Sequence, residues 1–83
     1  MPDADVAGLL AASKSAHAAY RRADAAKSGD AEKRIHIEHA LTARQDAHTA
    51  DPTHDEPEWG SETLEQHEAL VSFYESWLER HPS

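Results

Sequence analysis

The sequence predicts an all-α protein: an antiparallel helical hairpin plus a third amphipathic helix, in a small three-helix arrangement within a single domain (residues 1–83). Three observations predict this fold. Good helix formers dominate, since sixteen of the 83 residues are Ala and many others are Glu, Arg, Lys or Leu. Apolar side chains recur at helical spacing. One short Ser-Gly-Asp segment separates two long helical stretches, as in a helical hairpin.

The first helix is expected over residues 3–27. Pro2 suits a helix start, and Asp3 and Asp5 place negative charge at the positive end of the helix dipole. Residues spaced three and four apart form the predicted packing face, which consists of Val6, Leu9, Ser13, Ala16, Tyr20 and Ala23. Most of these side chains are small, so a neighbouring helix is expected to approach closely.

Ser28-Gly29-Asp30 is expected to end the first helix and to start the second. Gly29 suits the left-handed conformation that ends helices, and Asp30 suits the cap of a helix over residues 31–50. The predicted packing stripe of that helix consists of Arg34, Ile37, Leu41, Arg44 and His48, with Ala40 and Ala47 beside it. Two arginines in this stripe predict a thin seam or a buried ion pair.

Residues 51–60 are expected to form a loop, because Pro52, Pro57 and Gly60 interrupt helical geometry. Trp59 is expected to plug the end of the hairpin. Ser61 is the expected N-cap of the third helix, which is predicted over residues 61–80.

The third helix carries most of the large apolar side chains after residue 41. Its apolar arc is broader than a thin, Ala-rich hairpin needs, and four glutamates flank it. Such an arc predicts a partner-binding surface, made of Leu70, Phe73, Tyr74, Trp77 and Leu78. The alternative is that this helix is simply the third member of a bundle, with the arc in its core.

Large apolar residues are scarce in the whole chain. Leu, Ile, Val and Phe together number eleven of the 83 residues. In highly charged chains, a share of these residues below roughly 20% is typical of intrinsic disorder. Well-formed helices with so little apolar surface predict self-association or a protein partner.

The net charge of −8 belongs to the last third of the chain, where nine acids oppose Arg80 alone in residues 51–83. This acidity argues against direct binding of nucleic acid, because phosphate contacts require clustered Lys and Arg. An alternative function is that of a DNA mimic, which would present its carboxylates to the basic groove of a nucleic-acid-binding protein.

Seven histidines suggest a second alternative, a metal-binding helical protein. Glu32, His36 and His39 lie four and three residues apart on one face of the second predicted helix, and two imidazoles with a carboxylate suit zinc or iron. One helix supplies an incomplete ligand shell, so solvated histidines are the competing interpretation and no metal or cofactor is predicted outright.

Enzyme activity is not expected. The serines lie in helices or caps without a Gly-x-Ser-x-Gly turn, and no glycine-rich phosphate loop is present. So small a chain is also expected to offer little room for a ligand pocket. No apolar stretch is long enough for a membrane span and the N-terminus lacks a basic signal region, which predicts a cytoplasmic location or one inside a virion.

Two runs carry a resemblance: HIEHALTARQDAHTADPTHDEPEW (36–59) and HEALVSFYESWL (67–78). With its Ala/Arg-rich hairpin, the chain resembles small uncharacterised helical proteins of high-GC actinobacteria and their phages. The resemblance implies no catalytic or binding residues. It favours a non-enzymatic protein–protein interaction or assembly module, such as a phage virion or assembly subunit, as the predicted function.

Overall fold

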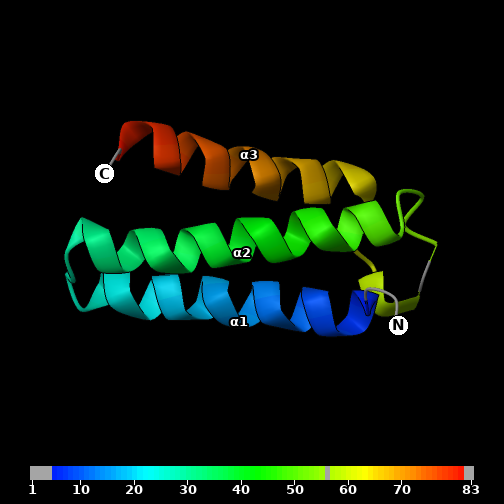
Figure 1. The fold of residues 1–83 in the computed structure, drawn as a ribbon, viewed down its shortest axis with the longest axis horizontal. Coiled ribbons are helices and arrows are strands. Elements are labelled where there is room, and N and C mark those ends of the chain that lie inside the picture. The colour runs from blue at the N-terminus through cyan, green and yellow to red at the C-terminus, as the bar shows by residue number, and fades with distance from the viewer. Residues whose placement is uncertain (1–4, 56, 82–83) are drawn as a thin grey trace.

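The computed structural model describes residues 5–55 and 57–81 and contains three α-helices there: α1 (Val6–Ala25), α2 (Asp30–Ala50) and α3 (Leu64–Arg80). A short 3-10 helix, η1 (Pro57–Trp59), lies between α2 and α3. The described residues form no strand, which confirms the all-α prediction. Figure 1 shows α2 in the middle, with α1 on one side and α3 on the other.

The turn between α1 and α2 differs from the prediction: α1 ends at Ala25 and not at residue 27, and Gly29, not Asp30, is the N-cap of α2. Lys27, not Gly29, takes the left-handed conformation, with φ of 59°. The Lys27 N–H donates to the Asp24 carbonyl at 3.0 Å and the Ser28 N–H donates to the Ala23 carbonyl at 2.9 Å, which is the Schellman pattern of a helix end. Gly29 is extended and precedes α2. The predicted start of the first helix, at residues 3 and 4, lies outside the described residues.

Small residues form the seam between α1 and α2. Ser13, Ala40 and Ala47 are fully buried, and the Ser13 hydroxyl donates to the Ala40 carbonyl at 2.9 Å. A serine side chain in contact with the opposite backbone requires the helices to lie close together. Every residue of the predicted α1 packing face is at least partly buried, so that prediction is confirmed.

Trp59 closes one end of the hairpin, as predicted. It is 3% exposed and packs with Val6, Leu10 and Ala47. Its indole N–H donates to an Asp51 carboxylate oxygen at 2.9 Å, so the polar edge of the buried ring is satisfied.

α3 begins three residues later than predicted. Thr63, not Ser61, is the N-cap: its hydroxyl accepts from the Gln66 N–H, and the Gln66 side chain accepts from the Thr63 N–H. This reciprocal capping box satisfies two backbone donors at once, which a cap at Ser61 would not do because the residue three positions later is Leu64.

The aromatic arc of α3 faces the rest of the protein. Tyr74 is 1% exposed and Trp77 is 3% exposed, and both pack with Ile37 and Ala40 of α2. Leu70 and Leu78 are partly buried against the same cluster. Of the five residues predicted to bind a partner, Phe73 alone is exposed. For Tyr74 and Trp77 the docking prediction is corrected: they pack within the chain, because α2 offers them an apolar surface. For Leu70, Leu78 and Phe73 partner binding stays a prediction.

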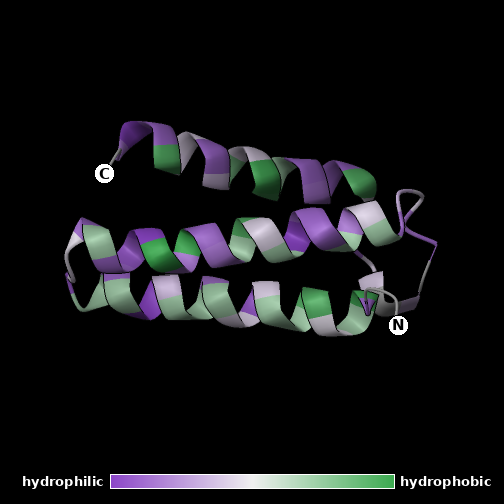
Figure 2. Cartoon of the chain, in the orientation of Figure 1, coloured by the Kyte–Doolittle hydropathy of each residue, from purple (hydrophilic) through white to green (hydrophobic). Residues whose placement is uncertain are grey.

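Polar and apolar residues alternate along all three helices in Figure 2. Within the described residues, no helix has the length and apolar character that crossing a membrane requires.

Candidate metal centre

Three histidines from three separate segments meet beside the hairpin end that Trp59 closes. His48 lies on α2, His54 in the loop that follows, and His67 in the first turns of α3. One nitrogen from each ring lies within 4.8 Å of the others. His48 Nδ1 and His54 Nε2 are 3.0 Å apart, and the His48 and His67 rings stack with centroids 4.9 Å apart. We call these three residues the His cluster.

The loop holds His54 in place by several independent contacts. Its ring stacks on the Trp59 indole at 3.6 Å between centroids and 7° between planes. The Asp51 carboxylate organises the turn beneath it, because it accepts from both the Thr53 hydroxyl and the Trp59 indole N–H. His54 itself has a φ of 57°, a left-handed conformation that is uncommon for residues with a side chain. Such strain is typical of functional positions.

The environment favours the uncharged form of two members of the cluster, His54 and His67. Burial, and after it the charge of Arg44, lowers the pKa of His67 from 6.5 to about 4. Burial also lowers the pKa of His54, followed in effect by the neighbouring His48. At neutral pH these two imidazoles are therefore uncharged, and the neutral imidazole is the form that binds a metal.

Arg44 borders the cluster from inside the protein. It is 2% exposed, and its Nη1 lies 2.5 Å from a Glu62 carboxylate oxygen and 3.3 Å from His67 Nδ1. This is the buried ion pair that the arginines in the α2 stripe predicted. Because an arginine always donates, His67 Nδ1 accepts and its Nε2 carries the hydrogen.

The metal candidates predicted from the sequence lie elsewhere. Glu32 and His39 are exposed and His36 is half-buried on α2. Within residues 5–55 and 57–81, the His cluster is the group whose geometry suits a metal, and it contains none of these three. The helical spacing of Glu32, His36 and His39 brings no ligand from another segment to them.

Sequence reasoning missed the His cluster because its members follow no local motif. The sequence does place His48 on the packing stripe of α2, which indicates correctly that this side chain faces the rest of the protein. His54 and His67 lie six and nineteen residues further along, in a loop and in another helix, and the contact among the three depends on how α3 docks.

No family model, curated protein or solved structure matches the chain.

Proposed function

We propose that this protein binds a divalent transition-metal ion, with Zn²⁺ the best fit, through His48, His54 and His67. The observation that carries this proposal is the convergence of three imidazoles from α2, the loop and α3, with ligand nitrogens within 4.8 Å of one another. Three neutral imidazoles are an established donor set for zinc.

The distances suit a small adjustment rather than a rearrangement. Zn–N bonds of about 2.0–2.1 Å place the nitrogens of a tetrahedral site about 3.3 Å apart. His48 Nδ1 and His54 Nε2 are already 3.0 Å apart. The metal would take the place of the hydrogen between them, and that hydrogen would move to the other nitrogen of its own ring. His67 would have to approach by rotation of its side chain.

One atom of the cluster is buried without a hydrogen-bond partner within the described part of the chain, His54 Nδ1. In the proposed site His54 binds the metal through Nε2, so Nδ1 is the atom that carries the ring hydrogen.

The positive charge of Arg44 repels a metal cation in the cluster, and the ion pair with Glu62 reduces that repulsion. Binding through His67 Nε2 would move the ring hydrogen to Nδ1, so Arg44 would lose its contact with His67 and keep Glu62. The Glu62 carboxylate lies 2.5 Å from Arg44 Nη1 and offsets the repulsion between the guanidinium and a divalent cation.

Metal binding would tie α3 and the loop to the hairpin. α1 packs against α2 over more of its length than α3 does, so α3 is the element with most to gain from a cross-link. Three protein ligands leave one tetrahedral position for water or for a group from another molecule. The function we propose is thus a metal-stabilised helical module.

The test is metal titration of protein that has been purified without an affinity tag and stripped with EDTA. We expect one Zn²⁺ per chain and a stabilisation of about 2.7 kcal/mol at a free-metal concentration 100 times the Kd. His54→Gln should weaken binding by roughly 10–100-fold or more, since even supporting residues of metal sites contribute that much.

His39→Gln is the matched control, because it removes a histidine of the same chain from an exposed position on α2. It should leave the affinity unchanged. Retention of binding in His54→Gln, or its loss in His39→Gln, would contradict the proposed ligands. Absence of stoichiometric metal with no thermal shift would reject the function and leave the cluster as a packed group of neutral rings.

Protein binding stays a separate prediction. Phe73 is 36% exposed, Leu64 43% and Ile35 52%, and these are the large apolar side chains that a partner would reach without opening the core. A stable monomer in a solution mass measurement, with no partner recovered, would count against the assembly function.

A further inference from the structure

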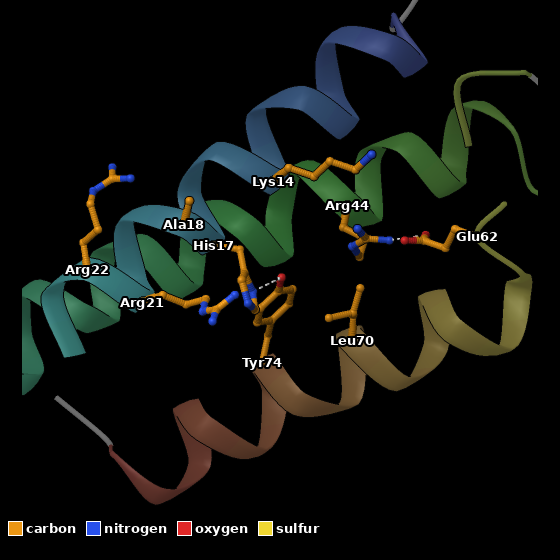
Figure 3. A pocket seen from close by; sticks show the side chains of 9 residues that line it. All are labelled: Lys14, His17, Ala18, Arg21, Arg22, Arg44, Glu62, Leu70 and Tyr74. Carbon is orange, nitrogen blue, oxygen red and sulfur yellow. Dashed lines mark hydrogen bonds and ion pairs between the residues drawn. The ribbon is translucent and has the colours of Figure 1, made fainter. Parts of the chain in front are cut away.

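A groove of about 550 Å³ lies between α1 and α3 (Figure 3). The ring of His17 meets the Tyr74 hydroxyl inside it, with His17 Nδ1 and the hydroxyl oxygen 2.8 Å apart. This volume falls within the roughly 300–1,000 Å³ of small-molecule sites. The expectation that so small a chain offers little room for a ligand pocket is corrected by this groove.

The groove is basic on a chain whose net charge is −8. Four of its lining residues are bases, Lys14, Arg21, Arg22 and Arg44, and one is an acid, Glu62. Glu62 is already paired with Arg44. Within the described residues, Lys14, Arg21 and Arg22 form none of the ion pairs. The positive charge is therefore available to a ligand.

The inner end of the groove is built from buried groups. Arg44 is 2% exposed, and its Nε has no hydrogen-bond partner in the part of the chain that the structure describes. Tyr74 is 1% exposed and lies beside Leu70, which supplies an apolar wall. In Figure 3 the Arg21 side chain points toward His17 and Tyr74, whereas Arg22 points away from them.

The chemistry of these walls specifies a ligand with two parts. Exposed cations at the mouth favour an oxyanion, because charge-assisted hydrogen bonds to carboxylate or phosphate are the strong ones. The Tyr74 ring and Leu70 favour an aromatic or aliphatic group next to it. His17 adds no charge at neutral pH, since burial and then the charges of Arg21 and Arg44 lower its pKa.

We propose that the groove between α1 and α3 binds a small molecule that carries a carboxylate or phosphate beside an apolar group. Lys14 and Arg21 contact the oxyanion, Arg44 supports it from the inner end, and Leu70 and Tyr74 contact the apolar part. This site shares Arg44 with the border of the metal centre, but it does not require metal to be bound.

The experiment is a titration of metal-free protein in EDTA at low ionic strength with two probes, phenyl phosphate and phenylacetate, followed by ¹H–¹⁵N NMR spectra. We expect shifts at the backbone amides of Lys14, His17, Arg21, Leu70 and Tyr74. The double variant Lys14→Gln/Arg21→Gln should lose about tenfold or more in affinity. Both side chains are exposed, so the fold is expected to persist.

The matched control is Lys27→Gln/Arg80→Gln, which removes the same charge from exposed positions that do not line this groove. Its affinity should change by less than about twofold, because distant surface charges are screened. Binding of one probe alone would support the groove and identify the oxyanion. Equal losses in both double variants, or shifts that spread over the whole surface, would overturn the proposal, as would no binding of either probe.

Discussion

α1 and α3 pack against α2 in different ways. The α1 seam is made of small side chains that lie close to the opposite backbone, as the Ser13 bond to the Ala40 carbonyl shows. The α3 seam is made of large aromatic rings and polar groups, among them Tyr74, Trp77 and His67. The long side chains on the α3 side enclose a groove with buried polar groups at its inner end and a His cluster. Both candidate sites accordingly lie next to α3.

The largest expected effect on stability tests whether buried aromatic side chains hold α3 against α2. Trp77→Ala should lower the free energy of unfolding by about 3–5 kcal/mol, because it leaves a cavity where a 3% exposed indole packed. Urea unfolding measures the change. Phe73→Ala is the control: Phe73 is 36% exposed on the same helix, so its loss should cost clearly less. Equal costs would mean that α3 is not held mainly by its buried rings.

A somewhat smaller effect is expected in the pH dependence of stability, which tests the buried His67 between α3 and α2. His67 is neutral in the fold, with a pKa of about 4 against 6.5 for a free histidine. The unfolded chain therefore binds the proton first, and the stability of metal-free protein falls as pH drops from 6.5 to 4, by roughly 3 kcal/mol at most. Below about pH 4 this contribution becomes constant.

The groups that face His67 define the control for that measurement. Arg44 and His48 face it from α2 and His54 from the loop, all favouring the neutral ring, while Glu62 opposes them. Because carboxylates also titrate in this range, the effect is taken as the difference between the wild-type protein and His67→Gln, both in EDTA. An identical loss of stability in both proteins would show that His67 is not held neutral.

The smallest effect tests the close seam. Ala40→Val adds two methyl groups at a position of α2 that meets both α1 and the Tyr74 and Trp77 rings of α3, and it should cost about 1–3 kcal/mol through overpacking. Ala40 is fully buried, whereas Ala11 is exposed on α1. Ala11→Val carries the same loss of helix propensity without the clash, so its change should be about 0.5 kcal/mol. Equal changes in both would mean that the helices have room to separate.

Local chemistry accounts for most of the fold. The α2 boundary predicted at 31–50 agrees with Asp30–Ala50 to within one residue, because apolar spacing and the Ser-Gly-Asp segment act over short distances. The start of α3 was misplaced at Ser61, since Thr63 with Gln66 makes the better capping box. The left-handed residue was predicted at Gly29, whereas Lys27 takes this conformation in the Schellman turn that ends α1.

The sequence by itself determined the helices, their apolar faces, the plug at Trp59 and the presence of a buried charge on α2. Each follows from residues within a few positions of one another. The tertiary structure alone decided that Tyr74 and Trp77 belong to the core, that His48, His54 and His67 meet, and that four bases line one groove. These arrangements depend on which face α3 turns toward α2, and that choice is made by packing between residues far apart in the chain.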